Sequence, residues 1–363
     1  MKILGIESSC DETAAAVVED GFRVLSSVVN SQIDIHAQYG GVVPEIAARS
    51  HIEVINPVIR EALARAQCSW DDIDAIAVTY APGLVGSLLV GTLAARTLAI
   101  LRNKPLYAIH HVEAHVYANF ITESNGSTLQ LPSKQPEFPL LALIVSGGHT
   151  QLVLFHGHGD YELLGQTQDD AVGEAFDKVA KILGLPYPGG PSIAAAARHG
   201  DPEKYHLPKA KLDNPYNFSF SGLKTAVLRA VQHAVGKDFT FPSHELPKLI
   251  NDVQREDFAA SFQRVAVETL VERTLRAYND FAPRSVVIAG GVAANQELRR
   301  QLSARLPIAI EYAPMQFCTD NAAMIATLGF FHTQYGIPAD PYTLDVVPSL
   351  SMVNTAWNSA KVL

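Results

Sequence analysis

The chain has 363 residues, of which 48% are hydrophobic, and a formal net charge of −9 at pH 7. This length and apolar content predict two lobes, each with a core of its own. The charge excludes a broadly basic surface, so contact with a nucleic acid requires a local patch or a partner chain. The three cysteines show neither metal-ligand spacing nor a disulfide framework, which fits a reducing compartment.

The first hundred residues predict a hairpin followed by alternating strands and helices. Two apolar runs, at 2–6 and Ala14–Val18, flank the small and hydroxyl-rich turn Ser8–Thr13, a pattern typical of a β-hairpin. The elements predicted after it are a strand at Ile73–Thr79, a helix at Ser87–Leu101 and a strand at 105–109.

The longest apolar run, Gly83–Leu101, approaches the length of a membrane span. It contains Arg96 and three glycines, which favours a buried helix of a soluble protein. The apolar run at 2–6 is too short for a signal-peptide core, so we expect a cytoplasmic protein.

The segment from His110 to Phe120 predicts a helix with two histidines on one face. His111 and His115 are one turn apart, which allows both imidazoles to bind one metal ion. In zinc-protease helices the glutamate directly follows the first histidine, whereas Glu113 is displaced by one position, which argues against a protease. Without a third ligand, two hydrogen-bonded histidines remain the simpler interpretation.

The second half of the chain repeats the order of the first. Apolar runs at Leu140–Val145 and Leu152–Phe155 flank the turn Ser146–Thr150, which predicts a second hairpin. The backbone N–H groups of this turn are suited to bind an anion. The alternative interpretation is an ordinary hairpin turn that binds no ligand. The later elements are predicted as a strand at Arg284–Ala289, a glycine turn at 290–295, a helix at Gln296–Leu306, a strand at Ile308–Tyr312 and a helix at Ala322–Phe331 capped by Thr319 or Asp320.

This repetition supplies a candidate third metal ligand. Asp320 precedes the last helix of the second half, as His111 begins the corresponding helix of the first. Two pseudo-symmetric lobes facing each other across a cleft would bring the two helix starts together. A His, His, Asp set leaves coordination positions open for water or substrate. The predicted fold is therefore α/β, with duplicated lobes at 1–135 and 136–345 and a tail at 346–363.

Nine ordered blocks of the sequence resemble the TsaD family. They lie at 5–13, 39–45, 82–86, 110–115, 145–150, 173–178, 187–191, 218–224 and 318–321. The similarity runs from residue 2 to about residue 348. Two departures stand out: Ala81 replaces an expected glycine, and the polar segment Ile121–Glu137 is longer than usual.

The resemblance implies the superfold shared by actin, hexokinase and Hsp70 (ASKHA). It also implies transfer of a threonylcarbamoyl group from threonylcarbamoyl-adenylate to the exocyclic amine of the adenosine next to the anticodon, in tRNAs that read ANN codons. The implied metal is Fe²⁺, or sometimes Zn²⁺, held by His111, His115 and Asp320. The implied partners are tRNA, a TsaB-like paralogue, a TsaE-like ATPase and a TsaC-type synthase that supplies the adenylate.

The resemblance further assigns a donor site, with Asp177 and Gly190 at the nucleotide sugar and Asn295 near the adenylate. The residues that line the donor in this assignment are Ile144, Val145, Ser146, Gly147 and Gly148. Simpler roles remain open for two of these residues. Asp177 can pair with a neighbouring lysine, and Asn295 can cap the next helix.

Proton transfer from the attacking amine needs an acceptor, and Asp11 or Glu12 in the first hairpin turn are the candidates. A solvated or capping acid is the alternative. Two other functions remain: an ATP-dependent kinase of the same superfold, and a non-catalytic scaffold like TsaB. Paired imidazoles argue against the Mg²⁺ site of a kinase, and a complete ligand set argues against a scaffold.

Overall fold

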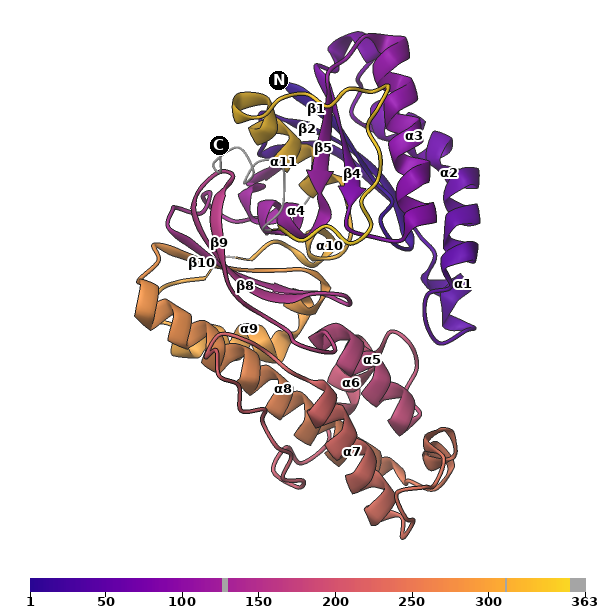
Figure 1. Cartoon of the computed structure of the whole chain (residues 1–363), viewed down its shortest axis with the longest axis vertical. Helices are drawn as coiled ribbons and strands as arrows, with labels where there is room; N and C mark the ends of the chain where they lie inside the picture. The colour runs from indigo at the N-terminus through magenta and orange to yellow at the C-terminus, as the bar shows by residue number, and fades with distance from the viewer. Residues whose placement is uncertain (126–129, 311, 353–363) are drawn as a thin grey trace. The chain divides into compact units, whose positions relative to one another are not determined.

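A computed structural model describes residues 1–125, 130–310 and 312–352, and Figure 1 shows their helices and strands. The described residues separate into two compact units. The first unit contains the described residues up to Phe138, the segment Phe155–Tyr161 and the described residues after Ile310. The second unit contains Pro139–Leu154 and Glu162–Ile310.

The first unit is built on a six-stranded sheet in the order β5-β4-β1-β2-β3-β6. Its strands are β1 (Lys2–Glu7), β2 (Glu12–Glu19), β3 (Arg23–Ser31), β4 (Ala75–Ala81), β5 (Leu106–His110) and β6 (Glu123–Ser124). Strand β1 pairs antiparallel with β2, where Gly5 lies opposite Ala16, and parallel with β4. The predicted hairpin and the two predicted strands after it are thus confirmed, with the bounds of β4 shifted by two residues.

Helices cover both faces of this sheet. They are α1 (Ile33–Ala37), α2 (Pro44–Arg65), η1 (Trp70–Asp72), α3 (Val85–Arg102), α4 (His111–Tyr117), η2 (Ala118–Phe120), α10 (Met315–Cys318) and α11 (Ala322–Tyr335). Leu4 and Ile6 of β1 point into the core formed with α2 and α3. Helix α11 packs on the opposite face, as Figure 1 shows. A Cβ atom on Gly5 would lie 2.3 Å from the Ala322 carbonyl oxygen, so α11 can approach β1 only over glycine.

Helix α3, the longest apolar run, is buried on one face only. Leu88 and Ala95 are fully buried, whereas Val85, Leu93 and Leu101 are exposed. By length and composition alone α3 could cross a membrane, but its packing against β4 and α2 is that of a partly buried helix of a globular unit. The expectation of a buried helix is therefore confirmed for one face of α3.

The aromatic cluster of the first unit encloses a histidine that sequence patterns did not single out. His158 stacks on Phe331, with ring centres 3.9 Å apart, and its Nδ1 atom lies 3.0 Å from the Tyr117 hydroxyl. Burial lowers the pKa of His158 from its ordinary value to about 4, because the cluster disfavours the charged ring. The folded state therefore holds this imidazole neutral where the unfolded chain protonates it.

This difference predicts a loss of stability in acid. As pH falls through the ordinary histidine pKa, His158 becomes protonated in the unfolded state but stays neutral in the folded state. The free energy of unfolding therefore decreases. Because the ring is partly exposed, we expect a loss of only about 1–2 kcal/mol between roughly pH 7 and pH 4. The variant His158→Phe should lack this loss in urea unfolding, whereas exposed His156→Phe should keep it. A pH dependence identical in His158→Phe and the unsubstituted chain would contradict the assignment.

The second unit has a four-stranded sheet in the order β10-β7-β8-β9. The strands are β7 (Leu140–Val145), β8 (Thr150–Gly157), β9 (Asp160–Gln166) and β10 (Ser285–Ala289), and the helices are α5 (Val172–Leu183), α6 (Gly189–Ala197), α7 (Ser221–Ala234), η3 (Ser243–Lys248), α8 (Asp252–Phe281), η4 (Gly291–Ala294) and α9 (Gln296–Arg305). Strand β10 runs parallel to β7, with Val287 opposite Ala142. The thirty-residue helix α8 packs against α6 and α9 (Figure 1).

Four neighbouring strands of the first sheet, β4-β1-β2-β3, follow the same order as the four strands of the second. In each unit three consecutive strands form a meander, and a later strand adds beside the first of them. This repetition confirms the duplicated α/β architecture. The predicted strand Ile308–Tyr312 is wrong, because residues 308–310 and 312 adopt no strand, and residue 311 lies outside the described residues. Pro307 and Pro314 flank this run, and proline cannot donate to a sheet ladder.

The boundary between the units also differs from the expected one. Residues 312–345 were expected in the C-terminal lobe, but the structure groups them with the N-terminal sheet. The reason is the apolar character of α11, which is buried from Ala322 to Gly329 and at Phe331 and packs against β1, β2 and β4. Asp320, just before α11, consequently belongs to the same unit as His111 and His115.

Candidate metal centre

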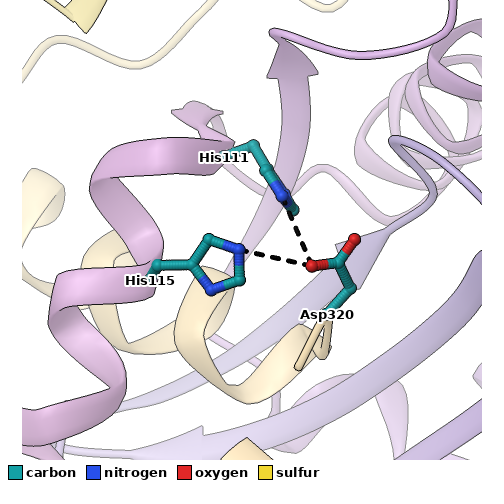
Figure 2. A group of neighbouring side chains, drawn as sticks. All are labelled: His111, His115 and Asp320. Carbon is teal, nitrogen blue, oxygen red and sulfur yellow. Dashed lines mark ion pairs between the residues drawn. The ribbon is translucent and has the colours of Figure 1, made fainter. Parts of the chain in front are cut away.

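The first two ligand candidates are placed by a strand that runs directly into a helix. Strand β5 ends at His110, and α4 begins at the next residue. The Nδ1 atom of His110 accepts a hydrogen bond from the Glu113 backbone N–H at 3.4 Å and so caps the helix. The predicted helix is thus confirmed, and Figure 2 shows His111 and His115 directed to the same point.

Asp320 completes the group. Its Oδ1 atom lies 3.5 Å from the Nε2 atom of His111 and 3.3 Å from that of His115 (Figure 2). The candidate ligand atoms of the three residues all lie within 4.8 Å of one another. The predicted set is therefore brought together, although within one unit and not across two lobes.

The predicted cap of α11 is wrong. Neither Thr319 nor Asp320 caps this helix; the Oδ1 atom of Asn321 accepts the bond from the Met324 backbone N–H at 3.0 Å. Asparagine is as good a cap as aspartate, and it carries no charge. Because Asn321 and not Asp320 caps the helix, the Asp320 carboxylate can face the two imidazoles.

The donor set fits a divalent transition metal. His115 is 1% exposed, yet neither of its ring nitrogens has a well-aligned hydrogen bond among the described residues. A buried imidazole whose nitrogens lack hydrogen bonds is costly unless a cation binds it. Two imidazoles and one carboxylate suit iron or zinc better than Mg²⁺ or Ca²⁺, which prefer oxygen ligands.

Glu7 is a candidate site residue that the sequence analysis missed. It ends β1, is fully buried, and its Oε2 atom accepts hydrogen bonds from His111 Nδ1 at 2.9 Å and from the Thr79 hydroxyl at 2.6 Å. The Ser9 backbone N–H donates to the other carboxylate oxygen. These bonds place the proton of His111 on Nδ1 and leave Nε2 to face Asp320. The signal available in the sequence was a carboxylate ending an otherwise apolar strand.

The electrostatics of the group are those of a charged network held out of water. Burial alone raises the pKa of Asp320, but attraction to His111 and His115 outweighs it and lowers that pKa. Burial likewise opposes charge on His111, and Asp320 and Glu7 together raise the pKa of its ring. Two carboxylates therefore converge on one imidazole, an excess of negative charge that a metal cation would balance.

The candidate proton acceptors lie on a tightly held turn of the same unit. His51 of α2 spans it, with Nε2 donating to the Cys10 carbonyl at 3.0 Å and Nδ1 accepting from the Thr13 hydroxyl at 2.7 Å. Burial, followed by the charges of Asp320 and Asp11, raises the pKa of Glu12 to about 9. Glu12 therefore retains its proton at neutral pH and lies within electrostatic reach of the metal group.

The turn proposed to hold the donor is packed against two glycines of the second unit. A Cβ atom on Gly173 would lie 2.5 Å from the Ser146 carbonyl oxygen, and one on Gly290, where φ is +89°, would lie 2.5 Å from that of Val145. A Cβ atom on Gly147 or Gly148 would meet nothing within 4 Å. Gly173 and Gly290 thus pack closely against the backbone of the turn, whereas Gly147 and Gly148 face open space.

The remaining donor residues have structural partners. The Oδ1 atom of Asp177 accepts from the Gly189 backbone N–H at 2.7 Å, next to Gly190, and the neighbouring Lys178 pairs instead with Asp170 and Glu174. Asn295 caps α9 through the Leu298 backbone N–H at 3.0 Å, as its simpler interpretation predicted. Neither contact tests a role in nucleotide binding.

The repeated meander and the His, His, Asp group define an α/β protein of the ASKHA superfold with a candidate transition-metal centre. A solved structure titled full-length HypF in the phosphate- and nucleotide-bound form shares this fold, with a TM-score of 0.57 at 12% identity over 92% of this chain and 47% of that one. The family model described as TsaD, tRNA N6-adenosine threonylcarbamoyltransferase, matches residues 23–327, and the chain belongs to this family.

Curated relatives cover nearly the whole chain. The tRNA N6-adenosine threonylcarbamoyltransferase of Symbiobacterium thermophilum is 54% identical over 96% of both chains, and that of Thermomicrobium roseum is 51% identical over 97% of both. The resemblance inferred from the sequence blocks is confirmed. The chain is a threonylcarbamoyltransferase of tRNA modification, and tRNA is its substrate.

Proposed function

We propose that this enzyme takes the threonylcarbamoyl group from threonylcarbamoyl-adenylate and attaches it to the exocyclic amine of the adenosine next to the anticodon, in tRNAs that read ANN codons. The observation that carries the proposal is the His111, His115 and Asp320 group, braced by Glu7, in a chain of this family. A kinase or a scaffold has no use for such a group.

We assign the three ligands to Fe²⁺, with Zn²⁺ as the alternative that the same donors accept. When bound, such an ion polarises the carbonyl under attack and offsets charge on the departing phosphate. The chain itself supplies the orientation: Glu7 fixes the ring of His111, and the helical spacing of α4 sets His115 beside it.

We assign the adenylate end of the donor to the second unit. The backbone N–H groups of Ser146, Gly147 and Gly148 are suited to the phosphate, and the carboxylate of Asp177 to the ribose hydroxyls. The complete proposed set is Ile144, Val145, Ser146, Gly147, Gly148, Asp177, Gly190 and Asn295. The open space at Gly147 and Gly148 supports this assignment, since nothing in the fold of the unit requires glycine there.

The open turn leads to a prediction. Gly147→Val should weaken binding of ATP or the adenylate by at least tenfold, because a branched side chain would stand between the anion and the backbone N–H groups. The thermal unfolding midpoint should change little, since its Cβ meets no atom. Gly173→Val is the contrasting control and should unfold the unit, since its Cβ would collide with the Ser146 carbonyl oxygen. Unchanged nucleotide affinity in Gly147→Val would leave this turn an ordinary hairpin.

For the proton of the attacking amine we propose Asp11 and Glu12 as an interacting carboxyl pair. Burial raises the pKa of Glu12 to about 9, with a smaller contribution from its hydrogen bond to Asp11, so Glu12 carries a proton at neutral pH. In such a pair one carboxyl donates while the other accepts, which suits a step that removes a proton from the amine. His51 and Ser87 hold the turn by bonds to the Cys10 carbonyl.

We propose that the enzyme acts in the cytoplasm with a TsaB-like paralogue, a TsaE-like ATPase and a TsaC-type synthase. The exposed apolar side chains of α2 and α3, among them Ile52, Val85 and Leu93, support a docking face on the first unit. A stable interface there would bury on the order of 1,200–2,000 Å² in total.

The decisive experiment reconstitutes the reaction. The purified chain is incubated with threonine, bicarbonate, ATP, the adenylate synthase and unmodified tRNA, with and without the partner proteins, and the nucleosides are analysed by mass spectrometry. Threonylcarbamoyl-adenosine should form only when the chain is present. Its absence under both conditions would refute the transferase proposal for this chain.

A further inference from the structure

Charge is divided unevenly between the two units. The described residues of the first unit include 9 lysines and arginines against 19 aspartates and glutamates, whereas the second unit has 18 against 17. The net negative charge of the first unit therefore repels a polyanion such as tRNA, whereas the second unit is close to neutral and does not. Local cationic surface for tRNA is best sought on the second unit.

Seven of the 18 lysines and arginines of the second unit form ion pairs within the described residues. They are Lys178, Lys209, Lys224, Arg255, Arg264, Arg276 and Arg300. Arg229 and Lys237 form no ion pair within the described residues. Each lies instead over an aromatic ring: the Arg229 guanidinium carbon is 5.5 Å from the centre of Phe239, and Lys237 Nζ is 5.0 Å from that of Phe241.

These residues sit on a turn that is tied back to the end of α7, which Figure 1 shows extending away from the sheet of the second unit. The Lys237 backbone N–H donates to the Gln232 carbonyl at 2.9 Å, and the Gln232 side chain donates to the Phe241 carbonyl at 3.0 Å. The exposed carboxylate of Asp238 accepts from the Thr240 backbone N–H at 2.8 Å. Hydrogen bonds to Gln232 thus hold the turn at Lys237 and at Phe241.

Phe239 is left largely in water by this arrangement. Its side chain is 68% exposed, on a backbone that the bonds to Gln232 hold in place. A phenylalanine flanked by cations and presented on a hydrogen-bonded turn has the composition of a stacking platform for an unpaired base. We call Arg229, His233, Lys237, Phe239 and Phe241 the α7-end surface; His233 is one helical turn from Arg229 and exposed.

We propose that the α7-end surface binds the tRNA substrate, with Arg229 and Lys237 on backbone phosphates and Phe239 stacked on an unpaired base. This inference rests on the proposed function in naming tRNA as the ligand. The observations favour RNA over a protein partner because the surface combines unpaired cations with an exposed ring at fixed spacing, and because a tRNA presents both phosphates and unpaired bases.

The test measures binding of unmodified tRNA to the full-length chain by fluorescence anisotropy over a series of salt concentrations. The double variant Arg229→Ala/Lys237→Ala should flatten the plot of log affinity against log salt by about 1.5–2 units, since two phosphate contacts are lost. Phe239→Ala should weaken binding about 5- to 100-fold with the slope unchanged, because stacking releases no counterions. Phe239→Trp should restore the affinity.

The matched control is Lys204→Ala/Lys211→Ala, which removes the same charge from exposed, unpaired lysines of the same unit that contact no ring. If this control flattens the slope as much as the α7-end variant does, the affinity for tRNA depends only on the net charge of the unit. That result would overturn the proposal. Unchanged affinity in Phe239→Ala would overturn it equally.

The binding assay involves no chemistry, so its result is separate from that of the transferase proposal. In the reconstituted reaction the α7-end variants should raise the KM for tRNA and leave kcat near that of the unsubstituted enzyme. A chain that binds tRNA through Phe239 but forms no modified nucleoside would uphold this surface and contradict the proposed function.

Discussion

His111→Ala and Asp320→Ala should each abolish stoichiometric metal binding and, with it, threonylcarbamoyl transfer. Removing one of three protein ligands leaves too few donors to hold the ion, so the loss of affinity should exceed the about 10–100-fold that an outer-shell change produces. The fold should persist, because the sheet packs on α2, α3 and α11 through apolar contacts that do not involve the ligands. Elemental analysis of the purified variants measures the metal content.

The control for this prediction is His332→Ala. His332 is a partly buried histidine of the first unit, on α11, and burial lowers its pKa to about 3, so its ring is neutral in the fold. Its removal should cost stability but leave the metal content at the level of the unsubstituted protein. Unchanged metal in both His111→Ala and Asp320→Ala would show that the centre is misassigned.

Glu7→Gln is the second change for which we expect a large effect. The glutamine has the same shape as Glu7 but replaces a carboxylate that receives bonds from His111, Thr79 and the Ser9 backbone by a neutral amide. An amide has a single acceptor oxygen, so either His111 or the Ser9 N–H then faces a donor, and in both cases His111 loses the negative charge that raises its basicity. We expect metal affinity to fall by about 10–100-fold, measured by competition with a chromophoric chelator.

Glu113→Gln separates this effect from simple loss of a buried carboxyl. Glu113 lies on α4 between the two histidines and is 1% exposed, but its carboxyl oxygen is bonded to the Tyr161 hydroxyl at 3.3 Å and not to a ligand. Metal affinity in Glu113→Gln should therefore stay near that of the unsubstituted protein. If Glu7→Gln and Glu113→Gln bind metal equally well, Glu7 does not orient His111.

The sequence alone determined the features that depend on neighbours along the chain. The spacing of His111 and His115 predicted that both imidazoles share one helix face, because an α-helix returns to the same side after four residues. The two hairpins followed from apolar runs around small-residue turns, and Asn295 as a cap followed from its place before a helix. The ordered blocks identified the family, because many short matches in one order are far more specific than any single turn.

Only the tertiary structure decided which distant segments meet. Glu7 and His111 are 104 positions apart, and their contact depends on β1 and β4 pairing beside β5 in one sheet. Asp320 joins the histidines because the apolar helix α11 packs on β1 over Gly5, a close approach that no local pattern in the sequence reveals. Local periodicity indicates which face of a helix or strand is buried. Which other element covers that face depends on packing across the whole unit.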